Sequence, residues 1–279
     1  MMIGSRGHDV LCDTDAKTLA QKMAEIGLNG VQLVPHKSFK GVSGKERIFS
    51  SGYARNIGKE FSKNGIDIAM LGSYFNMLEK DEVILKNDMD RFKEYLKFGK
   101  YFGCYLVGTE TGSHMANWTY HPDNHGEEAY QRVVALFKEL IAVAQKHGMF
   151  VGIEGAYNHT IGTPQRMKRL VDELDSENVL VILDPINYLN SDNWMNVKEI
   201  IQQSFELFGD RITLLHCKDF IVEDGKIKQV ALGRGEMDYP FVKTLIDQYR
   251  PELDLMIEGP TGSDLIESIS YLRDKVGFR

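Results

Sequence analysis

The chain has 279 residues, 43% hydrophobic and 26% charged, an ordinary composition for a globular protein with a sizeable core. Its 33 basic and 40 acidic residues give a formal net charge of -7, which predicts no basic surface for nucleic acid or anionic lipid. Cys12, Cys104 and Cys217 show no CxxC spacing, and no export signal or membrane-spanning run is visible. We therefore expect a reduced, cytoplasmic protein.

Short apolar segments alternate eight times with segments of helical periodicity, a pattern typical of a parallel sheet. The expected strands cover residues 1–4, 30–34, 66–71, 104–108, 150–154, 179–184, 212–216 and 253–258. Between them, Thr163 and Pro164 are typical of a helix start. Other helices are expected to end at Gly27, Gly65, Gly148 and Gly209. Because no linker separates two halves, we predict a single α/β domain over residues 1–279, a (β/α)8 TIM barrel rather than a doubly wound open sheet.

Two strand-to-helix loops, residues 36–50 and 108–126, are long for a barrel of this size. Loops of that length inside a compact domain often cover an active site. The alternative is a plain surface excursion. We expect both loops to lie over the end of the barrel where the strands finish.

Four consecutive strands end in side chains that can bind metal ions, namely Glu154, Asp184, His216 and Glu258. Any one of them could instead cap a helix, pair with a lysine or face water. The carboxyl ends of barrel strands meet on one face, and neighbouring strands lie about 4.8 Å apart. Three carboxylates so close would repel one another without a cation. The pattern predicts a divalent metal, and ligands without a thiolate suit Mn²⁺, Mg²⁺, Co²⁺ or Zn²⁺.

The segments GIEGAYN, ILDPIN, LLHCKDF, ALGRGEMDY and LMIEGP resemble successive blocks of the xylose isomerase-like barrel superfamily, in its sugar phosphate isomerase/epimerase branch. That branch holds proteins similar to D-tagatose 3-epimerase, hydroxypyruvate isomerase and inosose dehydratase, and endonuclease IV is a more distant member. The likeness covers residues 130–260, while the first half of the chain agrees mainly in its alternation of strands and helices. It implies one divalent metal ion bound by Glu154, Asp184, His216 and Glu258. Among the candidate metals we expect Mn²⁺.

The resemblance also implies an activity. A metal that binds the carbonyl and hydroxyl oxygens of a ketose acidifies the carbon-bound proton and stabilises the enediolate that forms. In similar epimerases, two glutamates act as the acid/base pair, which implies Glu154 and Glu258 here. We expect a sugar or sugar phosphate isomerase or epimerase whose partner is a small carbohydrate. The sequence is compatible with a monomer or a homo-oligomer. A dehydratase of a cyclic polyol ketone is an alternative activity that begins with the same proton abstraction.

Further polar residues follow the strands and are candidates for substrate binding: Asn187, Lys218, Arg234, Glu110, His8 and His36. Lys218 lies two residues beyond His216 and shares its face if the strand continues. Arg234 follows strand seven, where barrels often bind phosphate, although a glycine-flanked turn explains it equally well. Asn187 stands where similar epimerases and endonuclease IV often carry histidine, and its amide can hydrogen-bond a hydroxyl.

Three other functions compete with this interpretation. An endonuclease IV-like nuclease would need more metal ligands than the chain shows, because Asn187 replaces a histidine and no Asp-x-His follows strand seven. Lys218 also permits Schiff-base aldol chemistry. A catalytically silent sugar-binding barrel would keep the same pocket.

Overall fold

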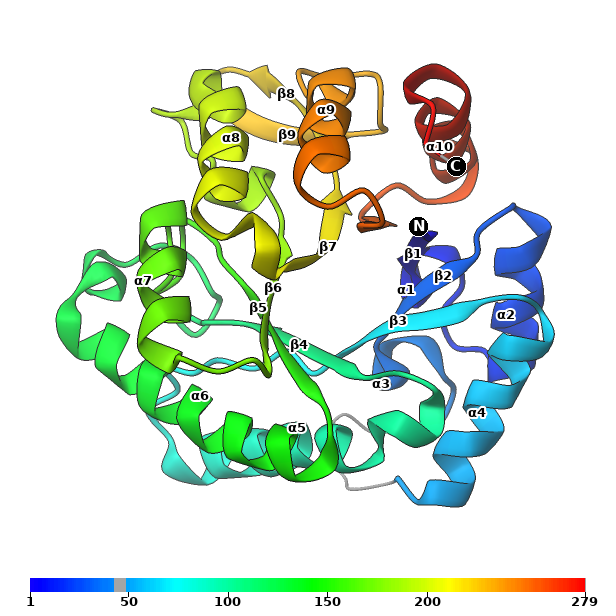
Figure 1. Cartoon of the computed structure of the whole chain (residues 1–279), viewed down its shortest axis with the longest axis horizontal. Helices are drawn as coiled ribbons and strands as arrows, with labels where there is room; N and C mark the ends of the chain where they lie inside the picture. Colours follow the sequence, from blue (N-terminus) through cyan, green and yellow to red (C-terminus); the bar gives the residue numbers. More distant parts are fainter. Residues whose placement is uncertain (43–48, 279) are drawn as a thin grey trace.

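Eight apolar segments form the parallel strands of a closed barrel in this computed structural model, which describes residues 1–42 and 49–278. The barrel strands are β1 (Ile3–Arg6), β2 (Gly30–Leu33), β3 (Asp67–Gly72), β4 (Leu106–Glu110), β5 (Phe150–Glu154), β6 (Val179–Leu183), β7 (Ile212–Cys217) and β10 (Asp254–Ile257). They follow the order β1-β10-β7-β6-β5-β4-β3-β2 around the barrel (Figure 1). The predicted (β/α)8 barrel is confirmed.

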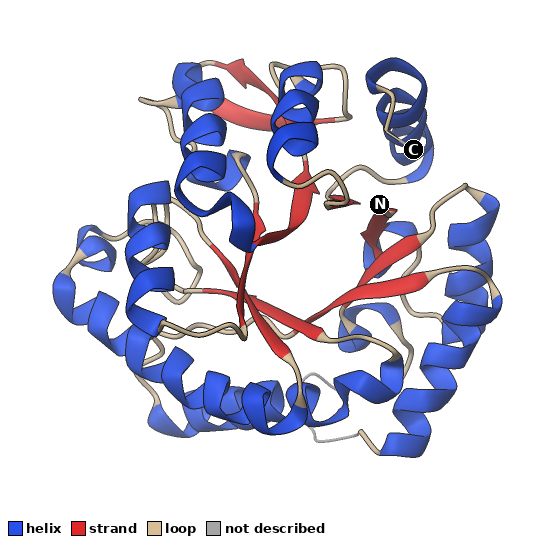
Figure 2. Ribbon diagram, in the orientation of Figure 1, coloured by secondary structure: helices blue, strands red, loops and turns tan. Residues whose placement is uncertain are grey.

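Helices surround the strands on the outside (Figure 2). The α-helices are α1 (Gly7–Val10), α2 (Ala16–Glu25), α3 (Pro35–Ser38), α4 (Ser51–Lys63), α5 (Glu82–Phe102), α6 (Glu127–His147), α7 (Pro164–Leu174), α8 (Val197–Phe208), α9 (Tyr239–Tyr249) and α10 (Gly262–Ser270). Short 3₁₀ turns are η1 (Pro122–His125), η2 (Ile186–Tyr188), η3 (Trp194–Asn196) and η4 (Gly209–Arg211), and η5 (Tyr271–Val276) is a π-helix. Within the described ranges, no helix combines the length and apolar character needed to cross a membrane.

The helix boundaries follow local chemistry. The Thr163 side chain accepts a hydrogen bond from the Arg166 amide, and Pro164 begins α7, as predicted. Gly27, Gly65 and Gly148 take positive φ just after α2, α4 and α6, again as predicted. Gly209 differs from the prediction because it keeps right-handed helical φ and ψ and begins the 3₁₀ turn η4.

The barrel interior contains one layer of large apolar side chains. Met70, Leu106, Ile182, Leu214 and Met256 form this buried cluster, each from a different strand. Glycines on β4 and β5 leave room for them, since a Cβ on Gly108 or Gly152 would lie 2.6 or 2.8 Å from the Ile182 side chain. The interior is therefore packed solid beneath the carboxyl ends of the strands.

A polar layer lies directly above the apolar one. Side chains alternate along a strand, so a residue two positions after an inward-facing residue also faces inward. Glu154 follows the inward-facing Gly152 by two positions, and His216 likewise follows Leu214. The same step from Ile182 leads to Asp184, just past the end of β6. The alternation that packs the core thus also aims the polar side chains at a common point.

The structure departs from the predicted strands in three places. β4 lies two residues later than expected, so Glu110 belongs to this strand. β1 lies two residues later than expected, so Arg6 belongs to the strand. The segment after β7, for which no strand was predicted, forms an antiparallel hairpin, β8 (Asp219–Glu223) with β9 (Lys226–Val230), outside the barrel (Figure 1). Its turn is Asp224-Gly225, both with positive φ, a combination that favours a tight hairpin.

The buried carboxylate of Asp219 ties this hairpin to the segment that follows it. Its two oxygens accept four backbone N–H groups at 2.9 to 3.0 Å, from Phe220, Gly233, Gly235 and Met237. Gly235 is needed for this approach, because a Cβ there would lie 2.2 Å from the Phe220 carbonyl oxygen. Asp219 therefore fixes the chain immediately after β7.

Candidate metal centre

Four side chains converge at the carboxyl ends of β5, β6, β7 and β10. Glu154 is the last residue of β5, Asp184 directly follows β6, His216 lies in β7, and Glu258 directly follows β10. One ligand atom from each lies within 4.8 Å of all the others. The first three side chains are buried and that of Glu258 is 13% exposed, so the cluster is open to solvent on one side only. The predicted convergence of these residues is present.

The imidazole of His216 is oriented by a partner on β2. Its Nε2 lies 2.7 Å from the Gln32 Oε1, and we assign a ring proton to this nitrogen because the amide oxygen only accepts. Nδ1 then faces the carboxylates, 3.1 Å from both Glu154 and Glu258. A ligating histidine whose other nitrogen is held in this way is typical of metal sites.

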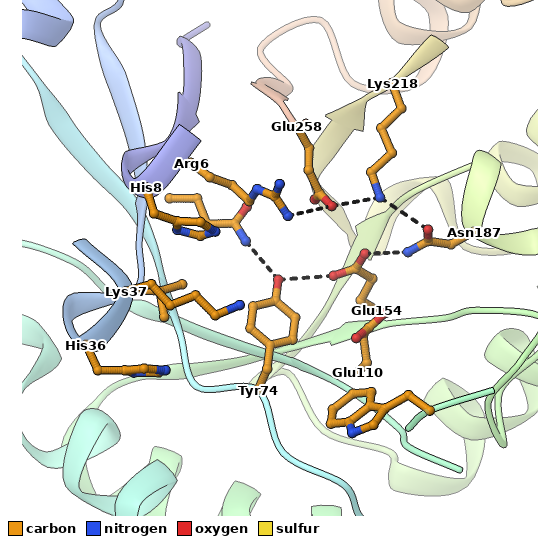
Figure 3. Close-up of a pocket in the computed structure, with 13 residues that line it drawn as sticks. Arg6, His8, His36, Lys37, Tyr74, Glu110, Glu154, Asn187, Lys218 and Glu258 are labelled. Carbon is orange, nitrogen blue, oxygen red and sulfur yellow. Dashed lines mark hydrogen bonds and ion pairs between the residues drawn. The ribbon is translucent and has the colours of Figure 1, made fainter. Parts of the chain in front are cut away.

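Neutral donors hold Glu154 from two sides. The Tyr74 hydroxyl donates to Oε2 at 3.1 Å, and the Asn187 amide donates to Oε1 at 2.8 Å. Tyr74 in turn accepts a hydrogen bond of 2.8 Å from Gln32, the residue that orients His216. These hydrogen bonds fix the Glu154 carboxylate, and the His216 imidazole is the charged partner beside it, at 3.1 Å (Figure 3).

Cations surround Glu258. Its Oε1 lies 2.7 Å from the Lys218 ammonium and 2.9 Å from an Arg6 nitrogen. Arg6 is fixed by a second, two-pronged contact with Asp9, at 2.7 and 3.0 Å. Lys218 also lies 2.7 Å from Asp184 and donates to Asn187 at 3.2 Å. Lys218 and Arg6 therefore supply positive charge to a cluster of carboxylates.

The protonation of the site reflects this crowding. Burial would lower the pKa of His216, but the Glu154 and Glu258 carboxylates outweigh it and raise the pKa to about 10. Burial would raise the pKa of Glu258, but the Lys218 and His216 cations lower it to about 2. The carboxylates therefore stabilise the charged form of the cationic side chains beside them.

A divalent cation fits this arrangement. Asp184 Oδ1 accepts the backbone N–H groups of Ile186 and Asn187, while its buried Oδ2 lies near Lys218 without a well-directed hydrogen bond. Three carboxylates and one oriented imidazole are ligands suited to Mg²⁺, Mn²⁺, Co²⁺ or Zn²⁺. This donor set matches a resident metal ion.

Comparison with known families agrees with this fold. A family model described as xylose isomerase-like TIM barrel matches residues 20–275. The chain belongs to this family. The resemblance inferred from the blocks after strands five to eight is confirmed, and it extends over nearly the whole chain. Among curated proteins, none matches the chain.

Solved structures of the xylose isomerase-like family share the architecture. A D-tagatose 3-epimerase-like protein has a TM-score of 0.76 and 16% identity, over 98% of this chain and 96% of that one. A xylose isomerase-like TIM barrel protein from Mycobacterium smegmatis, in complex with magnesium, has a TM-score of 0.75 and 13% identity, over 99% and 96%. D-psicose 3-epimerase, in the presence of D-fructose, has a TM-score of 0.70 and 16% identity over all of both chains. These likenesses establish the shared barrel.

A cavity of about 370 Å³ opens above the metal-ligand cluster. Its lining includes five of the candidate substrate-binding residues, namely Asn187, Lys218, Glu110, His8 and His36. Glu154 and Glu258 also line it (Figure 3). The xylose isomerase-like barrel thus places one pocket over both glutamates.

Arg234 is the candidate that the structure does not bring to this pocket. Its side chain is about half exposed and pairs with Asp264 and Glu267, both on α10. The pocket lining does not include it. The glycine-flanked segment after β9 turns its side chain toward a neighbouring helix.

The two long loops contribute unequally to what the structure describes. From the second loop, Trp118 lines the cavity, whereas Tyr120 stacks on Tyr157 with 5.1 Å between ring centroids. From the first loop, His36 and Lys37 on α3 line the cavity. Residues 43–48 of that loop lie outside the described part of the chain.

Several residues of the site escaped the sequence analysis. Arg6, Gln32 and Tyr74 contact the metal ligands directly or through one partner. Gln32 carried a usable signal, since it is a single polar residue inside the apolar segment GVQLV. His159 had no such signal in the sequence, because it lies in the loop after β5. The fold brings its Nδ1 to 3.8 Å from the Glu110 carboxylate.

Proposed function

We propose that this protein is a divalent-metal-dependent isomerase or epimerase of a small carbohydrate, which moves a proton on a carbon beside a carbonyl group. The observation that carries the proposal is the convergence of Glu154, Asp184, His216 and Glu258 beneath one pocket. A structural ion pair would not need three carboxylates at one point. An acid/base enzyme with a metal would.

Glu154, Asp184, His216 and Glu258 would hold the metal. When bound, the ion supplies a Lewis acid that polarises the carbonyl and acidifies the neighbouring C–H bond. Asp184 and His216 are fully buried and lie outside the cavity lining, so they serve as ligands only. Glu154 and Glu258 also face the cavity, which gives them access to a substrate carbon.

The two glutamates flank the pocket from strands separated by β6 and β7. One carboxylate can therefore take a proton from one face of a carbon while the other returns a proton to the opposite face, which inverts the centre. Return of the proton to the adjacent carbon would instead interconvert aldose and ketose. Tyr74 and Asn187 hold Glu154, and Arg6 and Lys218 hold Glu258, so neither carboxylate needs to reorient during transfer.

Pocket size and the named relatives support a monosaccharide. A cavity of about 370 Å³ is at the small end of ligand pockets and suits a compact substrate. A solved relative is a D-psicose 3-epimerase determined with D-fructose, and another contains magnesium. We take Mn²⁺ as the first metal to test, with Mg²⁺, Co²⁺ and Zn²⁺ as alternatives.

The environment of Lys218 argues against the aldolase alternative. A Schiff-base lysine must lose its proton before it attacks a carbonyl. Burial alone would lower the pKa of Lys218, but the Asp184 and Glu258 carboxylates outweigh it and raise the pKa above its ordinary value. Lys218 is therefore held as an ammonium ion, suited to stabilising charge and not to nucleophilic attack.

Solvent proton exchange tests the proposal. The protein, loaded with Mn²⁺, is incubated in D₂O with a panel of ketohexoses, ketopentoses and an inosose, and NMR follows deuterium at carbons beside the carbonyl. We expect incorporation into at least one sugar, together with an epimer or isomer as product. Loss of water from an inosose would identify the dehydratase variant instead. Binding without exchange across the panel would contradict the proposal and favour a sugar-binding barrel.

Matched variants make the test specific. Glu154→Gln and Glu258→Gln should each abolish formation of the epimer, since each removes the proton carrier of one face, and the bound metal is measured in both to separate chemistry from ligation. Glu128→Gln, at an exposed position on α6, is the control and should exchange at the parental rate. Full activity in both pocket variants would contradict their assignment as the acid/base pair.

A further inference from the structure

The pocket has two walls of opposite character. The carboxylates of Glu110, Glu154 and Glu258 reach it from the side of β4, β5 and β10. His8, His36 and Lys37 reach it from α1 and α3, the short helices that follow β1 and β2. Figure 3 shows these three side chains across the pocket from the glutamates, with the Lys37 ammonium directed toward Tyr74.

The cations that line the pocket differ in how they are neutralised. Arg6 pairs with Asp9 and Glu258, and Lys218 pairs with Asp184 and Glu258. Lys37 also lines the cavity, yet it forms no ion pair with any residue in the described ranges. One positive charge at the pocket wall is therefore left for a ligand.

The two histidines beside Lys37 also have unused polar atoms. Nδ1 of His8 and Nδ1 of His36 are buried and have no hydrogen-bond partner within the described part of the chain. Burial lowers the pKa of His8 to about 4, helped by the Arg6 charge, and burial also lowers the pKa of His36. Both rings are therefore neutral near pH 7, and each can offer one N–H group to a ligand oxygen.

The position of an anionic group in this pocket is constrained by the opposite wall. The Glu154 and Glu258 carboxylates repel a phosphate or carboxylate group, and a metal ion on the four ligands would be taken up by the reacting oxygens. If the reacting carbon lies over Glu154 and Glu258, the other end of a monosaccharide must extend toward the wall formed by His8, His36 and Lys37. That wall offers an ammonium and two neutral N–H donors, a combination suited to several anionic oxygens.

We infer that the substrate is a sugar with an anionic group, a phosphate or a carboxylate, at the end remote from the reacting carbon, and that His8, His36 and Lys37 bind this group. The inference rests on the proposed function for the position of the reacting carbon. It narrows the substrate class from carbohydrates in general to sugar phosphates and sugar acids. It places the anion site after β1 and β2, far along the sequence from Arg234.

Calorimetric titration of the Mn²⁺-loaded protein tests this inference without relying on turnover. The probes are matched: D-fructose with D-fructose 6-phosphate, D-ribulose with D-ribulose 5-phosphate, and D-fructuronate as the carboxylate arm. We expect at least one anionic probe to bind about ten- to a hundredfold more tightly than its neutral counterpart, the range for hydrogen bonds to a charged group. The anionic probe that binds more tightly than its neutral counterpart shows whether the site accepts a phosphate or a carboxylate group.

Variants locate the effect. Lys37→Gln should lower the affinity for the anionic probe about tenfold or more and leave the neutral sugar unchanged. Lys40→Gln, an exposed lysine three residues away that does not line the pocket, should change neither affinity. Because Lys37 is itself exposed, its substitution should preserve the fold. Equal binding of neutral and anionic probes, no binding by any probe, or an equal effect of both variants would overturn the inference.

The two proposals fail separately. Deuterium exchange into a neutral sugar, without any preference for anionic probes, would leave the proposed activity standing and remove the anion site. Tight, Lys37-dependent binding of an anionic probe without exchange would leave the anion site standing and contradict the isomerase.

Discussion

Replacement of Lys218 by methionine should weaken the metal-free protein much more than the metal-loaded protein. The Lys218 ammonium is almost fully buried and lies 2.7 Å from a carboxylate oxygen of both Asp184 and Glu258. Methionine has a similar length and no charge, so it removes the cation without opening a large cavity. The two carboxylates then keep His216 and Arg6 as their nearest cations.

The size of the effect follows from burial. Removing one partner of a buried ion pair costs about 3–5 kcal/mol, because the other charge stays desolvated. With saturating Mn²⁺, the metal supplies that missing charge, and the remaining loss should be about 1 kcal/mol for the hydrogen bond to Asn187. The loss of stability without Mn²⁺ thus exceeds the loss with Mn²⁺ by at least about 2 kcal/mol. By linkage, the variant binds Mn²⁺ roughly 30-fold more tightly than the parent does.

Urea denaturation at pH 7.5, in EDTA and in excess MnCl₂, measures both stabilities. Lys40→Met, at an exposed position outside the site, is the control and should change stability little in either condition. An equal loss with and without Mn²⁺ would show that Lys218 and a metal do not act on the same carboxylates. If Lys218→Met loses no stability in EDTA, the argument that Lys218 compensates a buried charge is refuted.

Three further predictions concern single residues. Asp219→Ala should destabilise the protein by more than about 3 kcal/mol in urea denaturation, because four N–H groups lose a charged acceptor; a loss below about 1 kcal/mol would contradict this. Burial and the Glu154 carboxylate raise the pKa of Glu110 to about 8, so folding favours its protonated form and stability should fall as pH rises from about 5 to 8. In Glu110→Gln the free energy of unfolding should decrease between pH 5 and pH 8 by at least about 1.4 kcal/mol less than in the parent, the equivalent of one pKa unit. An unchanged pH profile of stability would show that Glu110 ionises normally. Arg6→Lys should slow proton exchange about tenfold with little change in thermal stability, since it loses the fork that holds Glu258 and Asp9 together; parental exchange would remove Arg6 as a positioning residue.

The barrel could be predicted because its signals are local. Each strand is a short apolar segment, and all eight begin within two residues of the expected position. The hairpin β8 to β9 was missed because its second strand, KIKQV, alternates charged and apolar residues and is mostly exposed. A two-stranded ribbon outside the core lacks the continuous apolar run that marks a buried strand.

The metal ligands were predictable for a related reason. Glu154, Asp184, His216 and Glu258 each end or directly follow an apolar strand segment, and barrel topology brings such positions together. Their supporting residues depend on contacts across the barrel. Gln32 meets His216 from 184 residues away, and Tyr74 meets Glu154 from 80 residues away. No short-range pattern specifies such pairs, so the network and the departure of Arg234 from the pocket emerge only in three dimensions.

Metal stoichiometry tests the central claim most directly. The purified protein is stripped with chelator, dialysed against MnCl₂, and analysed for metal per chain, alongside His216→Ala, Asp184→Ala and the control Lys40→Gln. We predict one tightly bound equivalent in the parent and the control, and its loss in both ligand variants, with the fold checked by circular dichroism. Three equivalents per chain, or full retention of the ion in folded His216→Ala and Asp184→Ala, would contradict a single metal held by these four side chains.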